Sequence, residues 1–421
     1  MTSHAAVVAR GMGKCCVSGA GAININYKAR TVEIDGTVLK EGDYMSLNGS
    51  TGEVYLGKIE TKPAEVTGDF AKLMELCSKY TRLVVRTNAD TPHDAQVARG
   101  FGAVGIGLCR TEHMFFENEK IKAMREMILA RTKEGREKAL EKLLPYQKQD
   151  FYGILKAMDG YPVNIRLLDP PLHEFVPHDL EGQRIMAEEM GVSVEEIQQR
   201  VNSLSEHNPM LGHRGCRLGI TQPQIYKMQV EAIFNSAIRL AKEGMVIKPE
   251  IMIPLIAEKS ELVYLKKLLV EHIGTIFNKH HIEPFPYEIG TMIELPRACF
   301  IADQLAEEAD FFSFGTNDLT QMTYGFSRDD IGKFIQHYKD KEIMSFDPFQ
   351  TIDQAGVGEL MKIAISKTRQ VNPNLPIGVC GEVGGDPTSI PFFQDIGITY
   401  VSCSPYRVPA ARLAVAQANL S

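Results

Sequence analysis

The chain of 421 residues lacks an excess of basic side chains, with 46 lysines and arginines against 53 aspartates and glutamates and a formal net charge of −7. This balance gives no positive surface for nucleic acids or anionic lipids. No run approaches the roughly 20 apolar residues of a membrane span, and residues 1–10 lack the layout of a signal peptide. We therefore expect a cytoplasmic protein that binds small molecules or proteins. Nucleic acids and membranes are not expected among its partners.

Paired cysteines are also missing. The eight cysteines are scattered, and only Cys15 and Cys16 are close neighbours. This spacing matches neither a zinc site of two CxxC pairs nor a small disulfide scaffold, so most of them are expected to be reduced and buried. What is present is ordinary for a soluble globular protein: 44% hydrophobic and 24% charged residues. At roughly 150 residues per domain, the length predicts two to three domains.

Two kinds of pattern divide the chain. Residues 31–57 alternate short β-branched runs with Asp-Gly, Glu-Gly and Asn-Gly pairs, which predicts consecutive tight hairpins. Residues 61–67 contain a proline and little apolar surface, as a linker would. The predicted domains are a β-rich unit over 1–58, a linker leading into the next domain over 59–81, and a large α/β domain over 82–421.

The large domain alternates apolar strands with amphipathic helices. Eight strands are predicted, at 83–86, 104–108, 163–168, 250–254, 288–293, 311–314, 377–380 and 400–403. The longest amphipathic runs between them are 119–144, 224–242, 258–277, 297–308 and 356–368. Eight such repeats favour a (β/α)8 barrel (TIM barrel) over an open doubly wound sheet, and no GxGxxG fingerprint follows any predicted strand.

Polar residues stand where these apolar runs stop. A barrel gathers the carboxyl ends of its strands on one face, where barrel enzymes keep their active sites. The residues predicted to meet there are Arg86-Thr87-Asn88, Cys109-Arg110, Asp169, Glu294, Thr316-Asn317-Asp318, Cys380-Gly381-Glu382 and Ser404.

The residue types at these strand ends predict binding of a metal and an anion. Glu294 and Asp318 offer hard oxygen ligands of the kind that Mg²⁺ takes. Arg110 and Arg166 offer planar forks that match phosphate or carboxylate oxygens. Together they predict a pocket for a small phosphorylated or carboxylated anion, with charge building up on an oxygen that a metal holds. The alternative for either arginine is a structural ion pair.

Cys380 lies in a glycine-rich run, GVCGEVGGDP, which leaves its thiol unshielded. A thiol with an ordinary pKa of about 8.5 is mostly protonated at neutral pH and can serve as a general acid to carbon. An inert buried cysteine and a covalent nucleophile remain alternatives.

His4 follows the good N-cap residues Thr2 and Ser3 and precedes an alanine-rich run. It is therefore expected in the first turn of a helix that Gly11 stops. An anion on its imidazole would face free backbone N–H groups and the positive end of the helix dipole, which suits a phosphohistidine. A solvated terminal side chain is the alternative.

Eight segments together resemble the pyruvate phosphate dikinase branch of the phosphoenolpyruvate (PEP)-utilising enzymes. They are MTSHAAVVARGMGKCCVSG, GIGLCRTEHMFF, RLLDPPLHEFVP, GHRGCRL, GTMIELPRA, FFSFGTNDLTQMTYGFSRDD, CGEVGGDP and YVSCSPYRVPAARLA. The resemblance covers essentially the whole chain, from the phosphohistidine motif onward. It implies that 1–58 is part of the swivelling phosphohistidine domain and that 82–421 is the PEP- and pyruvate-binding barrel.

The resemblance also implies roles for single residues. His4 would carry the phosphoryl group, and Thr2 matches a regulatory phosphorylation site of plant members. Arg110 and Arg166 match the arginines that hold PEP, and Glu294 and Asp318 match the Mg²⁺ ligands. The remaining substrate contacts implied are Glu294, Gly315, Thr316, Asn317 and Asp318. Cys380 matches the acid that protonates enolpyruvate to give pyruvate.

The implied activity is a phosphotransferase half-reaction, in which phosphohistidine and pyruvate give PEP and histidine through Mg²⁺-bound enolpyruvate. Two departures stand out: Val383 replaces the histidine common after Cys-Gly-Glu, and the ATP-binding part has no counterpart in the sequence, so full activity is not expected. The family also implies a homodimer through the barrel. Alternatives are the PEP-protein phosphotransferase enzyme I, a Mg²⁺-dependent enolate lyase or aldolase on a similar barrel, and a non-catalytic fragment that binds substrate or dimerises.

Overall fold

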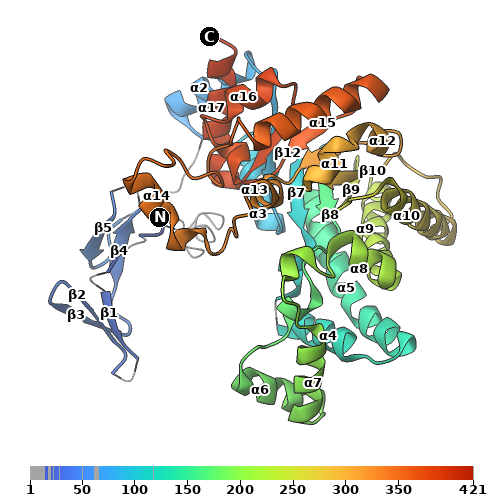
Figure 1. Cartoon of the computed structure of the whole chain (residues 1–421), viewed down its shortest axis with the longest axis horizontal. Coiled ribbons are helices and arrows are strands. Elements are labelled where there is room, and N and C mark those ends of the chain that lie inside the picture. The colour runs from blue at the N-terminus through green and yellow to red at the C-terminus, as the bar shows by residue number, and fades with distance from the viewer. Residues whose placement is uncertain are drawn as a thin grey trace. The chain divides into compact units, whose positions relative to one another are not determined.

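The computed structural model describes residues 15–17, 20–21, 23–27, 29–49, 51–60, 66–116 and 118–420. The described residues separate into two compact units (Figure 1). The first lies within Met1–Lys72 and Ser327–Asp347, and the second within Leu73–Phe326 and Pro348–Ser421. The domain limits at 58, 59–81 and 82 stay a prediction.

The first unit is rich in β-strands, as its hairpin signals predicted. The strands β1 (Ile23–Asn26), β2 (Thr31–Ile34) and β3 (Thr37–Lys40) form an antiparallel sheet, and β4 (Met45–Asn48) pairs with β5 (Glu53–Leu56). Asp35 and Gly36 join β2 to β3 with φ values of 46° and 79°. Such a two-residue turn needs positive φ at both positions, which an Asp-Gly pair adopts at little cost. The unit also contains η4 (Ile331–Lys333) and α14 (Ile335–Asp340).

The second unit is a closed barrel of eight parallel strands, which confirms the predicted (β/α)8 fold (Figure 1). The strands follow chain order around the barrel, and the last strand, β13, pairs with the first, β6, to close it. Their apolar side chains are buried on both faces, which explains why each strand reads as a nearly continuous apolar run. The strands are β6 (Val84–Asn88), β7 (Ile106–Arg110), β8 (Pro162–Arg166), β9 (Lys248–Ile253), β10 (Glu288–Ile293), β11 (Phe312–Phe314), β12 (Ile377–Val379) and β13 (Tyr400–Cys403).

Helices surround this barrel, and the helical hairpin of α6 and α7 projects away from the strands (Figure 1). The helix α2 (Gly68–Ser78) leads into the unit. The others are α3 (Pro92–Gly100), α4 (Asn118–Leu129), α5 (Lys133–Ala157), α6 (Leu180–Met190), α7 (Val194–Leu204), α8 (Gly215–Thr221), α9 (Pro223–Lys242), α10 (Lys259–His280), α11 (Pro296–Phe300), α12 (Ala302–Ala306), α13 (Thr316–Tyr324), α15 (Val357–Val371), α16 (Ile390–Asp395) and α17 (Val408–Ala418).

Two amphipathic runs that were each predicted as one helix are divided into two helices in the structure. The run 119–144 is divided between α4 and α5, because Thr132 takes an extended conformation and its hydroxyl accepts a hydrogen bond from the N–H of Gly135. This N-cap starts a new helix inside an unbroken amphipathic pattern. The run 297–308 is likewise divided between α11 and α12, where Ile301 leaves helical geometry with φ −113° and ψ 20°.

The cysteines follow the sequence prediction. All eight are free thiols, and six of them are buried. No helix in the described part of the chain is long and apolar enough to cross a membrane.

Candidate active site at the barrel mouth

The barrel brings most of the predicted strand-end residues to one end. Arg86 is an exception, because β6 continues to Asn88 and the Arg86 guanidinium pairs with Glu250 in the first half of β9. Arg110 and Arg166 are the last residues of β7 and β8, and these strands pair so that the two arginines are register partners. Glu294 follows β10, residues 315–318 follow β11, and Cys380 follows β12. Because parallel strands in a closed barrel end on the same face, these residues share the mouth of the barrel.

A chain of buried ion pairs connects the mouth residues. Arg166 pairs with Glu112 and lies 3.0 Å from Asp169, measured from Nη1 to Oδ2. Asp169 Oδ2 also lies 2.6 Å from Arg214 Nη2, and Arg214 Nη1 lies 3.1 Å from Asp318 Oδ1. Burial opposes the charge of Asp169, but Arg166 and Arg214 outweigh it and hold the pKa of this carboxyl below its ordinary value. These pairs link β8 to α8 and α13.

Arg110 differs from the other two arginines. Its backbone N–H donates to Asp90 Oδ1, 2.6 Å away. Its guanidinium makes no hydrogen bond or ion pair with any residue that the structure describes, and it is only half-buried. A guanidinium that no carboxylate occupies is available to an anion that enters the mouth.

Glu294 places an unsatisfied carboxylate oxygen in the same region. Its Oε1 accepts a hydrogen bond from the N–H of Leu255 at 2.6 Å, whereas its buried Oε2 has no partner among the described residues. Burial, together with the nearby charges of Asp318 and Asp169, raises the pKa of Glu294 well above its ordinary value. A bound cation would relieve both the desolvation and the repulsion.

The backbone of Gly315 lies directly against Glu294. A Cβ on Gly315 would lie 2.7 Å from Met292 Sδ and 2.8 Å from Glu294 Oε2. Thr316 Oγ1 and Asn317 Oδ1, in the first turn of α13, are also buried without a partner among the described residues. The turn between β11 and α13 therefore brings backbone and side-chain polar atoms close to the carboxylate.

We expect Gly315→Ala to destabilise the second unit by about 1–3 kcal/mol, because the added methyl group overpacks a buried site. Gly274 in α10 is the matched control, since a Cβ there meets nothing within 4 Å. Gly274→Ala should be stabilising by up to about 1 kcal/mol, as is usual for glycine in a helix interior. Thermal unfolding of both variants measures the difference; equal transition midpoints would show that the Gly315 backbone has room to move.

Cys380 lies inside an apolar cluster with Leu108, Met252, Met292 and Phe311. Burial raises the pKa of its thiol to about 11, although Ser313, Arg110 and Arg166 act in the opposite direction. The thiol is thus protonated near neutral pH. The side-chain amide of Asn88 donates to the carbonyl oxygen of Cys380 at 3.3 Å, which fixes the backbone that carries the thiol.

Sequence reasoning missed three contributors to this site. Glu112 and Arg214 hold the buried ion pairs, and Ser313 lies beside the Cys380 thiol. Arg214 stands in the GHRGCRL segment, which carried the resemblance but predicted no role. Ser313 could have been found as an inward-facing polar residue in the apolar run FFSF. Thr2 and His4 lie outside the described residues.

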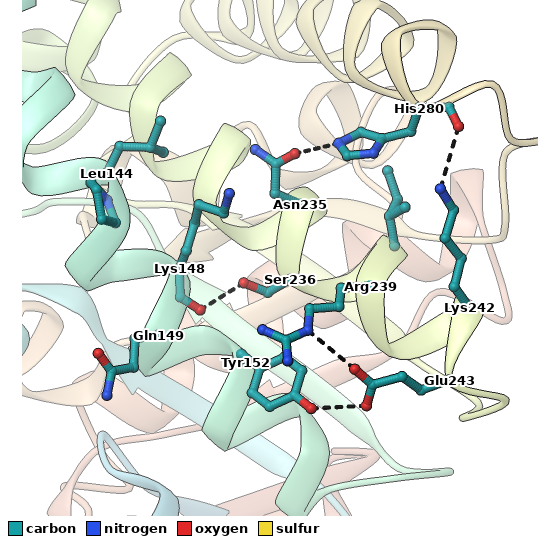
Figure 2. A pocket seen from close by; sticks show the side chains of 12 residues that line it. Leu144, Lys148, Gln149, Tyr152, Asn235, Ser236, Arg239, Lys242, Glu243 and His280 are labelled. Atoms are coloured by element: carbon teal, nitrogen blue, oxygen red, sulfur yellow. Dashed lines mark hydrogen bonds and ion pairs between the residues drawn. The ribbon is translucent and has the colours of Figure 1, made fainter.

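A groove of about 840 Å³ lies away from this mouth, between α5, α9 and the end of α10 (Figure 2). Two of its cations have local partners. Arg239 donates to Glu243 Oε1 at 3.1 Å and lies over the ring of Tyr152, and Lys242 donates to the carbonyl of His280. Cations in the last turn of a helix are also favoured by the helix dipole. Arg239 and Lys242 are therefore not free to bind an anion in this groove.

Fold and site together define a class of protein: a (β/α)8 barrel with arginines, carboxylates and a buried thiol at its strand ends. Comparison with known proteins specifies the family. A model described as "PEP-utilising enzyme, PEP-binding domain" matches residues 64–420, and one described as "PEP-utilising enzyme, mobile domain" matches residues 1–52. The chain belongs to the PEP-utilising enzymes.

Several relatives are named pyruvate, phosphate dikinase. The chain is 56% identical to that of Clostridium symbiosum over 422 residues, 56% identical to that of Giardia intestinalis over 419, and 54% identical to a chloroplastic one of Flaveria pringlei over 420. These alignments cover 99–100% of this chain but 48%, 47% and 44% of the relatives. The chain thus spans about half the length of the curated relatives it matches.

Proposed function

We propose that this chain catalyses the pyruvate half of the pyruvate phosphate dikinase reaction, in which phosphohistidine and pyruvate give PEP and free histidine through enolpyruvate. One observation carries the proposal: a partner-free guanidinium, an unsatisfied buried carboxylate oxygen and a protonated buried thiol share one barrel mouth. The names of the relatives support the same reaction. No step of the ATP half is assigned to residues of this chain.

Arg110 and Arg166 have different roles in binding. The Arg110 fork is free to donate to phosphate or carboxylate oxygens of the substrate. Arg166 is held by Glu112 and Asp169, so it contributes a fixed positive charge with little freedom to move. Gly315, Thr316 and Asn317 provide a close backbone approach and two buried polar atoms for the remaining oxygens. Fixed charges and dipoles of this kind stabilise developing charge without reorganising.

Cys380 is the proposed general acid. When the phosphoryl group moves from PEP to His4, the O–P bond breaks and an enolate remains. The methylene carbon of the enolate then takes the proton from the Cys380 thiol, which gives the methyl group of pyruvate and a thiolate. In the other direction the thiolate removes a methyl proton. Val383 is buried beside this turn, and no proton relay through that position is proposed.

Glu294 and Asp318 are the proposed ligands of Mg²⁺. The buried Glu294 Oε2 has no partner among the described residues, and the pKa of this carboxyl is raised partly by Asp318, as expected of a site that needs a cation. The described residues contain no group of three His, Cys, Asp or Glu side chains that could hold a metal. Two carboxylates suffice for Mg²⁺, whose other positions are filled by water and substrate oxygens. Bound Mg²⁺ would stabilise negative charge on the substrate oxygen.

His4 is the proposed phosphoryl carrier and Thr2 a regulatory position next to it; the match of residues 1–52 to the mobile domain supports the first assignment. We further propose a homodimer formed through the barrel and a cytoplasmic location, with no nucleic acid and no membrane as partners. The net charge of −7 disfavours nucleic acid. Light scattering after gel filtration tests the dimer, and the chloroplastic relative makes cell fractionation the test of the compartment.

Incubation with PEP and Mg²⁺ tests the function. We expect one phosphate on His4 by mass spectrometry, and none after EDTA treatment or in His4→Asn. A phosphate that appears on another residue, or none in the presence of metal, contradicts the assignment of His4. Exchange of pyruvate methyl protons with deuterated solvent tests the barrel independently of His4.

A further inference from the structure

We infer that Asp90 and His113 form a positioning pair that keeps the guanidinium of Arg110 free for the substrate anion. The inference rests on the proposed function, in which Arg110 binds the substrate anion. Neither Asp90 nor His113 touches the reacting atoms in this scheme; both act through Arg110.

Asp90 joins two consecutive strand ends. It follows β6 by two residues, and its carboxylate reaches across to the turn that leaves β7. Its Oδ1 accepts from the N–H of Arg110 at 2.6 Å, and its Oδ2 lies 2.7 Å from Nδ1 of His113, a residue of η1 (Thr111–Phe115). One carboxylate thus holds both the start and the middle of this turn.

The proton in the second contact belongs to His113. An ionised carboxylate only accepts hydrogen bonds, so Nδ1 is the donor. This hydrogen bond raises the pKa of His113, whereas Arg110 lowers it and Glu112 raises it further. Arg110 is the N-cap of η1 and His113 lies within it, so both side chains leave the same turn.

Each carboxylate near Arg110 is paired with another group. Glu112 is paired with Arg166 through Oε1, whereas its buried Oε2 has no partner among the described residues. Asp169 is paired with Arg166 and Arg214, and both oxygens of Asp90 are occupied as described. A guanidinium placed beside an unoccupied carboxylate would bind it in the geometry that a substrate phosphate needs. His113 therefore prevents Asp90 from competing with the substrate for Arg110.

The experiment compares PEP binding by isothermal titration calorimetry, with Mg²⁺ present, in the whole chain. His113→Ala exposes Asp90 Oδ2, and we expect the Kd for PEP to rise at least tenfold. The double variant Asp90→Asn with His113→Ala removes the competing charge, while the amide oxygen still accepts from the Arg110 N–H. It should restore the Kd to within about threefold of wild type, a rescue that a merely structural role of His113 would not produce.

Asp310→Asn is the matched control. Asp310 also accepts from a backbone N–H, that of Ile289 at 2.7 Å, and lies 3.1 Å from the Lys266 amine, but it stands just before β11, at the end of the strands opposite the mouth. Its substitution should leave the Kd for PEP unchanged. If His113→Ala does not fold, His113→Phe replaces it, because phenylalanine fills the volume of the ring without a hydrogen-bond donor. The Kd for PEP of this variant should also rise at least tenfold.

The outcomes distinguish failure of the proposed function from failure of the Asp90–His113 pair alone. A wild-type chain that does not bind PEP overturns the proposed function and the pair with it. Binding by wild type that is equal in His113→Ala overturns the pair alone. Weak binding that the double variant does not restore also overturns it, because His113 would then act by some route other than protecting Arg110 from Asp90.

Discussion

Replacing Cys380 with alanine is expected to slow the exchange of pyruvate methyl protons by about 10²–10⁴-fold, the usual contribution of a general acid or base. The thiol is the proposed proton carrier in an apolar cluster that offers no other acid. Because burial raises its pKa to about 11, the thiol holds its proton at neutral pH and the thiolate is scarce. The exchange rate of the unaltered chain should therefore rise with pH between about pH 7 and 9, as the basic form becomes more populated.

Cys299→Ala is the control for this variant. Cys299 is another buried thiol, and burial raises its pKa to about 12, but it lies in α11 and has no proposed role in the chemistry. The Cys299→Ala variant should exchange pyruvate methyl protons at the wild-type rate. Proton NMR in deuterated buffer measures the rates, and thermal unfolding checks that both variants are folded. An undiminished rate in Cys380→Ala would assign the proton to a different group.

Replacing Arg166 with methionine is expected to lower the free energy of unfolding by about 3–5 kcal/mol, the usual effect of removing one partner from a buried ion pair. The substitution leaves Glu112 and Asp169 as buried carboxylates without the guanidinium that pairs with both. Since Arg214 also pairs with Asp169, part of the network remains and the loss should stay within this range.

An exposed ion pair provides the comparison. Arg131 lies 2.9 Å from Glu196, with side chains 75% and 39% exposed, against 9% for Arg166. Arg131→Met should change the free energy of unfolding by only about 0–1 kcal/mol, because water screens an exposed pair. Urea unfolding followed by far-UV circular dichroism measures both. Equal effects would mean that Arg166 contributes no more than a surface charge.

The barrel could be predicted because each strand is buried on both faces. Runs such as 288–293 and 400–403 coincide with β10 and β13, and the eight predicted strands are the eight of the barrel. Local breaks were harder to predict. The amphipathic period of 119–144 continues through the cap at Thr132, so hydrophobic periodicity alone did not reveal the division into α4 and α5.

The ion-pair network could not be predicted from spacing. Arg214 is separated from Asp169 by 45 positions and from Asp318 by 104, and the intervening helices α6 and α7 carry no signal of these contacts. Sequence reasoning therefore placed carboxylates and arginines at one mouth without showing how they pair. Thr2 and His4 stay predictions, since they lie outside the described residues.

Local apolar pattern by itself determined that this chain forms a (β/α)8 barrel after a β-rich segment, and the strand ends indicated several of the side chains at its mouth. Only the tertiary structure decided that Arg166 is paired while Arg110 is free, that Glu294 keeps an unsatisfied oxygen, and that the Cys380 thiol holds its proton. The physical reason is that charge and protonation depend on desolvation and on the nearest charges in space, which are distant in sequence.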